Sequence, residues 1–153
     1  MPARSDPVPE HEPAVPAVFV YGTLRPGRSN WPVAAPFCER AEPATLPGFG
    51  LYALAYPVVA ASEDGGGVRG DILWLAPDRA SEALARFDAF EGVDRDRPDR
   101  SYYRRTCVEV VVDGDRPGRR VEAWVYVPGD ELRREVRPER RVPGDDWPPP
   151  GDA

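Results

Sequence analysis

The sequence predicts an α+β fold: a single domain in which a mixed or mainly antiparallel sheet curls into a small barrel with a flanking helix. Its 153 residues suit one domain better than two. Short runs rich in β-branched and aromatic residues outnumber the one clear helical segment. Because a helix with one apolar face must cover a sheet, these elements predict an α+β domain.

Three strands are expected in the first 61 residues of the chain. The run AVFVY, residues 17–21, is β-branched and aromatic and stops at Gly22. A loop follows over residues 22–30, and turn residues then surround two short apolar stretches within residues 46–61. We expect these two stretches to be strands rather than helices.

A further strand, VRGDILWL over residues 68–75, leads into the predicted helix. Pro77 suits the first turn of a helix, where a missing N–H group costs nothing. Ala80, Leu84 and Phe87 follow with i, i+4, i+7 spacing. This spacing marks the helix face that packs on the sheet.

The last predicted elements form a β-hairpin. Residues 102–112 and 120–127 alternate with a period of two, and the turn DGDRPG separates them. In the first strand, one face carries Val108, Val110 and Val112, and the other carries Tyr103, Arg105, Cys107, Glu109 and Val111.

The ends of the chain differ in composition from its middle. Half of the 20 prolines lie in residues 1–16 and 138–150, which predicts disordered tails. We therefore expect a Pro-rich leader over residues 1–16, a folded domain over residues 17–130 and an Arg/Pro-rich tail over residues 131–153. The arginines of this tail favour a solvated segment over contact with nucleic acid or an acidic surface.

Missing residue types exclude several classes of chemistry. Every basic residue is Arg, and the lack of Lys excludes Schiff-base and P-loop mechanisms. The single histidine, His11, lies in the leader, so a Ser-His-Asp triad or a His-based zinc site has no convincing base. Cys38 and Cys107 lie far apart, and we expect two reduced thiols, no disulfide and no metal site. Carboxylates and tyrosines are left for proton transfer.

Charge and hydropathy predict a cytoplasmic protein without a membrane or nucleic-acid partner. The opening residues lack the apolar segment of a secretion signal. The uncharged run over residues 43–62 approaches the length of a membrane span, but prolines and glycines interrupt it. A net charge of −6 disfavours binding to a phosphate backbone. No pattern indicates the oligomeric state.

Glu91 is the candidate acid or base. It continues the apolar face of the predicted helix, just before Gly92 ends that helix. Burial raises the pKa of a carboxyl group toward neutrality and makes it a usable proton shuttle. A structural interpretation is equally open, in which Glu91 points to solvent at the helix end or pairs with Arg104 or Arg105.

The strand end VYGTLRPG is a second candidate feature. A strand that stops at a glycine can turn several backbone N–H groups into one concavity, which can hold a carboxylate or an oxyanion. Most turns of this kind only reverse the chain, so the turn alone is weak evidence.

Taken together, several segments resemble the γ-glutamylcyclotransferase-like superfamily, including its γ-glutamylamine cyclotransferase branch. The combination of YGTL with a downstream D-x-x-E-G and YRR carries this resemblance. The similar segments keep the family's order over residues 17–127, and they are VFVYGTLRPG, YPVV, VRGDILWL, FDAFEG, YYRR and AWVY.

The resemblance implies a mixed-sheet barrel with flanking helices and a pocket at the YGTL loop. Glu91 matches the family's acid/base, and neither a metal nor an organic cofactor is implied. Tyr103 and Tyr126 are also explained as ordinary strand aromatics. The positions that match the glutamyl-binding loop and the pocket lining are Tyr21, Gly22, Thr23, Leu24, Tyr103 and Tyr126.

The implied activity is that of a γ-glutamyl cyclotransferase, an amide-cleaving enzyme of the acyltransferase or lyase type. The α-amine of the γ-glutamyl group attacks its own γ-carbonyl, and 5-oxoproline leaves together with a free amine or amino acid. The charged loop over residues 93–101 leaves the amine half of the substrate unidentified. Two alternatives stay open: a non-catalytic module that binds a small anion, and a hydrolase that removes γ-glutamyl groups in a biosynthetic pathway.

Overall fold

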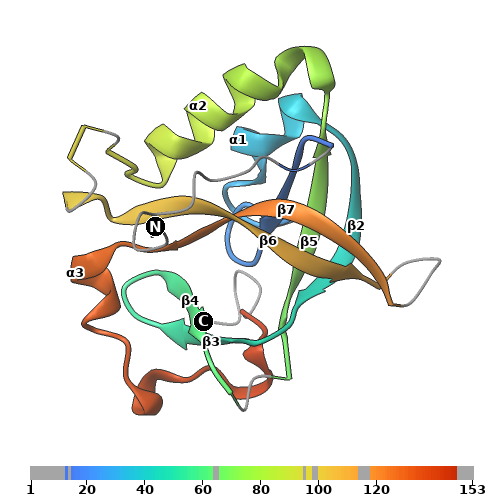
Figure 1. Ribbon diagram of the computed structural model, residues 1–153. Coiled ribbons are helices and arrows are strands. Elements are labelled where there is room, and N and C mark those ends of the chain that lie inside the picture. Colours follow the sequence, from blue (N-terminus) through green and yellow to red (C-terminus); the bar gives the residue numbers. More distant parts are fainter. Residues whose placement is uncertain are drawn as a thin grey trace, which may run out of the picture.

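The computed structural model describes residues 13, 15–63, 66–94, 96–97, 100–113 and 118–147. A closed five-stranded barrel lies at its centre, with a separate two-stranded hairpin below it and helices around both (Figure 1). This architecture confirms the predicted α+β barrel. The strands are β1 (Ala17–Val20), β2 (Cys38–Leu46), β3 (Phe49–Ala53), β4 (Pro57–Ala61), β5 (Val68–Leu75), β6 (Tyr103–Val112) and β7 (Arg119–Pro128), and the α-helices are α1 (Trp31–Ala34), α2 (Ala80–Phe90) and α3 (Asp130–Arg133).

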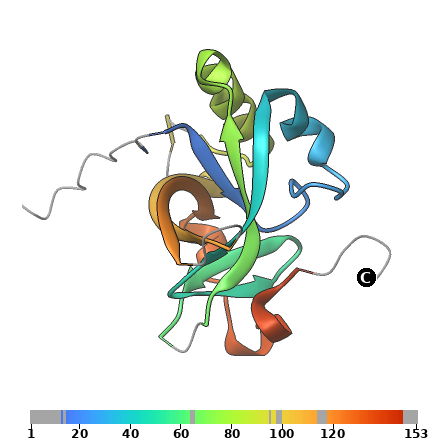
Figure 2. The same ribbon diagram turned by 90° about the vertical axis from the view of Figure 1, so that its right-hand side faces the viewer.

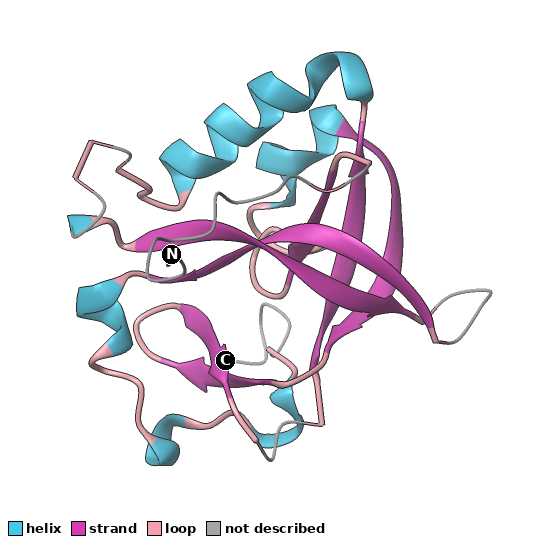
Figure 3. Cartoon of the chain, viewed as in Figure 1, coloured by secondary structure: helices cyan, strands magenta, loops and turns pink. Residues whose placement is uncertain are grey.

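The barrel closes in the strand order β1-β5-β2-β6-β7. Strand β1 pairs antiparallel with β5 and parallel with β7, and this parallel contact closes the barrel. The predicted hairpin is β6–β7, which keeps one register along its whole length and curls across the sheet in Figure 3. Residues 114–117 of its turn lie outside the described part of the chain.

Alternation along the strands divides the apolar side chains between two cores. Phe19, Ile72 and Val125 belong to a cluster inside the barrel, whereas Val18 and Trp124 belong to a second cluster on its outer face. Neighbouring residues of a strand point to opposite faces, so a barrel covered by a helix needs apolar residues at successive positions. The nearly continuous apolar runs of β1 and β7 satisfy this need.

Helix α2 covers this outer face of the barrel (Figures 1 and 2). Phe87 is fully buried there and meets Phe37 edge to face, with ring centroids 6.0 Å apart. Ala80 and Leu84 are half-buried against the same cluster, which confirms the predicted face. Ala83 is fully buried as well, because it lies one turn before Phe87.

Strand β2 was not predicted, because its sequence CERAEPATL is charged and contains Pro43. It nevertheless pairs with β5 along its length, and with β6 at Ala44 and Thr45. The Pro43 carbonyl accepts a hydrogen bond from the N–H of Asp113 at the end of β6. The missing N–H of Pro43 therefore faces the sparsely paired β6 side and leaves the ladder with β5 intact.

The expectation of a disordered C-terminal tail is wrong for residues 131–147. This segment packs against the β3–β4 hairpin, where Val142 is buried and Trp147 contacts the barrel cluster. The buried Asp145 carboxylate accepts the Leu51 N–H at 3.0 Å and pairs with Arg141 at 2.7 Å. Composition alone did not reveal these contacts, which join residues far apart in the sequence. The expected leader lies almost wholly outside the described residues.

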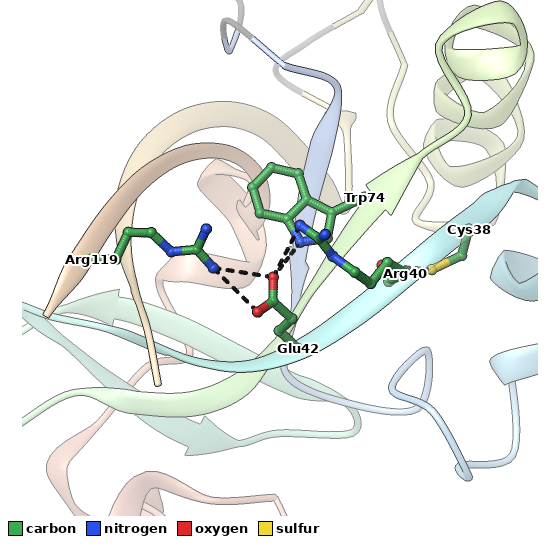
Figure 4. A network of polar contacts seen from close by, with 5 residues as sticks. All are labelled: Cys38, Arg40, Glu42, Trp74 and Arg119. Carbon is green, nitrogen blue, oxygen red and sulfur yellow. Dashed lines mark hydrogen bonds and ion pairs between the residues drawn. The ribbon is translucent and has the colours of Figure 1, made fainter. Parts of the chain in front are cut away.

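A polar network ties β2 to β5 and β7 on the side of the barrel shown in Figure 4. Glu42 accepts the indole N–H of Trp74 at 2.8 Å and pairs with Arg119 at 3.2 Å and with Arg40 at 3.3 Å. The Cys38 thiol donates to the Arg40 carbonyl. The pair of Glu42 and Arg119 thereby connects β2 to β7, which are not hydrogen-bonded to each other because β6 lies between them.

Among the described residues, no helix has the length and apolar character needed to cross a membrane.

Candidate active site

A cavity of about 550 Å³ opens between the end of β1, the end of α2 and the loop before β4. Its only charged side chain among the described residues is Glu91. Aromatic rings supply much of the remaining wall. All seven residues that the sequence selected border this cavity, namely Tyr21, Gly22, Thr23, Leu24, Glu91, Tyr103 and Tyr126.

The end of helix α2 determines where Glu91 lies. Gly92 has a φ of 71°, and its N–H donates to Ala89 while the Val93 N–H donates to Asp88. These two bonds form a Schellman motif, in which glycine adopts the left-handed conformation that other residues avoid. Glu91 is the last residue before this reversal, so its side chain leaves the helix at the cavity wall.

Burial raises the pKa of Glu91 from 4.5 to about 7. Loss of hydration is the cause, and no hydrogen bond or ion pair to another described residue offsets it. The structural alternative of a pairing with Arg105 is wrong, because Arg105 binds Asp88 at 2.9 Å. A carboxyl group with this pKa exchanges its proton readily at neutral pH.

The loop after β1 forms the wall next to Glu91. Asn30 ties it together, since its N–H donates to the Thr23 carbonyl at 2.9 Å and its side-chain amide donates to the Thr23 hydroxyl at 2.8 Å. In the described chain, the N–H groups of Gly22, Thr23 and Leu24 donate to no main-chain carbonyl. Three neighbouring N–H groups of this kind can donate hydrogen bonds to an anionic group of a ligand.

Gly22 also allows a close approach of two loops. A Cβ atom at this position would lie 2.7 Å from the Cγ atom of Pro57. Because real Cβ atoms do not come this close to a ring carbon, Gly22 is required for the observed contact between the β1 loop and the loop before β4. Sequence reasoning placed a glycine turn here but did not include Pro57.

Three tyrosine hydroxyls lie in the wall and each donates to a protein acceptor. Tyr21 donates to the Tyr126 carbonyl at 2.7 Å, Tyr103 donates to the Pro57 carbonyl at 2.7 Å, and Tyr126 donates to the Asp88 carboxylate at 2.6 Å. Burial raises the pKa of all three phenols, and the nearby Glu91 carboxylate contributes to each shift. All three tyrosines therefore stay neutral near pH 7.

Asp88 is the residue that sequence reasoning missed. It is buried, accepts two guanidinium bonds from Arg105 at 2.9 and 3.1 Å, and accepts the Tyr126 hydroxyl. Arg105 also stacks on Trp124, with its Cζ atom 4.3 Å from the ring centroid. A signal was present, because Asp88 is the Asp of the D-x-x-E-G segment and follows Phe87 on the buried side of α2.

Exposed aromatic side chains surround the cavity mouth. Tyr56 and Tyr102 are each more than half exposed, and their rings lie 6.2 Å apart. Phe90, at the end of α2, is 42% exposed and borders the same cavity. In the part of the chain that the structure describes, no group of His, Cys, Asp and Glu side chains could hold a metal ion.

Comparison with known proteins gave matches over most of the chain. A family model described as gamma-glutamyl cyclotransferase, AIG2-like, matches residues 18–149. Among solved structures, an AIG2-like protein from Mus musculus is 26% identical, with a TM-score of 0.58 over 85% of this chain and 83% of that chain. A protein from Arabidopsis thaliana is 25% identical, with a TM-score of 0.57 over 82% of this chain and 74% of that chain.

A yeast gamma-glutamyl cyclotransferase specific to glutathione shares the fold, with 14% identity and a TM-score of 0.51 over 74% of this chain and 68% of that chain. The search of curated proteins gave no match.

Proposed function

Because the chain belongs to the gamma-glutamyl cyclotransferase, AIG2-like family, we propose that it cleaves a γ-glutamyl amide by intramolecular cyclisation. The family implies an enzyme of the cyclotransferase type. The products of the proposed reaction are 5-oxoproline and a free amine or amino acid. The observation that carries the proposal is a carboxyl group with a pKa of about 7, Glu91, that shares a cavity with the loop of Gly22, Thr23 and Leu24. In the described part of the chain, the N–H groups of these three residues donate to no main-chain carbonyl.

The substrate supplies its own nucleophile, so the protein needs none. Glu91, in its ionised form, takes a proton from the α-ammonium group, and the free amine attacks the γ-carbonyl carbon to form a five-membered ring. Glu91 then passes this proton to the nitrogen of the leaving amine, the oxyanion re-forms the carbonyl, and the C–N bond breaks. The ring nitrogen gives up its remaining extra proton to the departing amine, which leaves as an ammonium ion, and Glu91 is ionised again. One carboxyl group near pKa 7 serves both steps, since it exists in both protonation states at neutral pH.

The free N–H groups of Gly22, Thr23 and Leu24 support the second part of the proposal. They are candidates to hold the α-carboxylate of the substrate or the oxyanion that develops on the γ-carbonyl. Removal of one donor of this kind typically costs a factor of about 100 to 1,000 in kcat. A cavity that folds the substrate also gains part of the advantage of an intramolecular reaction.

The test is a panel of γ-glutamyl amides and γ-glutamyl dipeptides, incubated with the purified protein and analysed by mass spectrometry. We expect 5-oxoproline from at least one compound and a loss of at least about 100-fold in rate for Glu91→Gln. Glu82→Gln is the matched control, because Glu82 lies on the same helix with its side chain 63% exposed.

Two outcomes contradict the proposal. Release of glutamate instead of 5-oxoproline identifies a hydrolase, and ligand binding without any turnover identifies a binding module. A cytoplasmic location stays a prediction from the sequence, which cell fractionation tests.

A further inference from the structure

The hydrogen-bond partners of the tyrosine hydroxyls in the cavity wall determine where each hydroxyl proton points. A tyrosine hydroxyl has one proton to donate, and a main-chain carbonyl can only accept. Tyr103 must therefore donate to the Pro57 carbonyl. Asp88 already accepts two bonds from Arg105, so Tyr126 is the donor in its 2.6 Å bond with Asp88.

This assignment determines what the wall offers to a ligand. With their protons used, Tyr103 and Tyr126 have only oxygen lone pairs left for a group in the cavity. The ionised Glu91 carboxylate can also only accept. Tyr103, Tyr126 and Glu91 all line the same cavity, so their oxygens are available to one ligand.

We propose that Asp88 is a positioning residue, which holds the hydroxyl proton of Tyr126 and leaves the Tyr126 oxygen as an acceptor. Together with Tyr103 and Glu91, this oxygen forms a subsite for the α-ammonium group of a γ-glutamyl substrate. An ammonium group carries three donors and a positive charge, which match three acceptors of which one is anionic. The inference rests on the proposed function for the identity of the substrate.

The rest of the structure agrees with a fixed position for Tyr126. Its backbone carbonyl accepts the Tyr21 hydroxyl, and its strand β7 pairs with β6 at Arg105. Arg105 in turn stacks on Trp124. Asp88 therefore connects α2 to β6 and β7 directly behind the cavity wall. Asp88 itself does not border the cavity, so its effect on a ligand passes through Tyr126.

The inference is tested by binding, which does not depend on turnover. The two probes are L-glutamate, which serves as the γ-glutamyl probe, and glutarate. They differ only in the α-ammonium group, and neither contains an amide bond to cleave. Calorimetry at pH 7 measures the affinity of the wild-type protein for each probe. We expect the γ-glutamyl probe to bind at least about 10-fold more tightly than the probe without the α-ammonium group, because hydrogen bonds to a charged group are strong. Equal affinity for the two probes overturns the inference.

Variants then separate a positioning role from a structural one. Tyr126→Phe and Asp88→Ala are each expected to reduce the preference for the γ-glutamyl probe several-fold. In the double variant, Asp88→Ala is expected to add nothing to Tyr126→Phe, because Asp88 acts through that hydroxyl. A preference that Tyr126→Phe leaves unchanged overturns the inference, even where Asp88→Ala does not fold.

Glu42→Gln is the matched control. Like Asp88, Glu42 is a carboxylate that binds an arginine and the polar group of an aromatic side chain, here the indole N–H of Trp74, but it does not line the cavity. It is expected to keep the wild-type preference. Absence of 5-oxoproline from every substrate would refute the proposed function and leave the binding comparison valid.

Discussion

Replacement of Glu91 by Gln is expected to stabilise the protein at alkaline pH while it removes most of the activity. Burial raises the pKa of Glu91 from 4.5 to about 7, so the folded protein holds this proton more tightly than the unfolded chain does. Between these two pH values the folded state binds more protons than the unfolded state. The free energy of unfolding therefore falls as the pH rises through this window.

The size of this effect follows from the shift. One pKa unit corresponds to about 1.36 kcal/mol, so a rise from 4.5 to about 7 corresponds to at most about 3 kcal/mol. This contribution is fully present below pH 4.5 and is lost above pH 7. Gln has the shape of the protonated acid and no charge at any pH. Glu91→Gln is therefore expected to match the wild type at pH 4.5 and to exceed it by up to about 3 kcal/mol at pH 8.

Urea denaturation at pH 4.5, 6 and 8, followed by far-UV circular dichroism, measures this difference. The release of 5-oxoproline, measured in parallel, is expected to fall by a factor of about 100 to 10,000. Glu82→Gln serves as the control, because its exposed carboxylate carries no comparable burial cost. A stability difference between Glu91→Gln and wild type that does not change from pH 4.5 to 8 would refute the idea that burial raises this pKa.

The other predictions concern the loop, the helix and the C-terminal segment. Gly22→Ala is expected to keep the circular dichroism spectrum and to lower kcat/KM at least about 10-fold, because its Cβ would meet Pro57 at 2.7 Å; full activity would contradict this. Phe87→Ala is expected to cost about 3 to 5 kcal/mol in urea denaturation, whereas Phe90→Ala, on an exposed ring, should cost far less. Asp145→Ala is expected to cost about 1 to 3 kcal/mol, because it leaves the buried N–H of a β3 residue without its acceptor; unchanged stability would show that the C-terminal segment does not support the hairpin.

Most of the strands and the main helix could be predicted from local pattern alone. Residues 68–75 form β5 as expected, and the alternation in residues 102–112 and 120–127 produces the hairpin β6–β7. Period-two alternation and helical spacing are properties of neighbouring residues, so a single chain displays them directly. Strand β2 escaped prediction because its partner strand β5, not its own composition, stabilises it.

The sequence selected seven residues of the cavity wall, but it did not indicate Pro57, Asp88 or the hydrogen bonds of the candidate site. The position of Glu91 on the apolar face and the glycine turn after β1 pointed to the cavity, and the structure brings them together. The contact of Asp88 with Tyr126 joins residues 38 positions apart, and that of Asp145 with Leu51 joins residues 94 positions apart. A local pattern in the sequence indicates which side chains are buried. The partner of a buried polar group depends on how distant segments pack, so only the tertiary structure decides it.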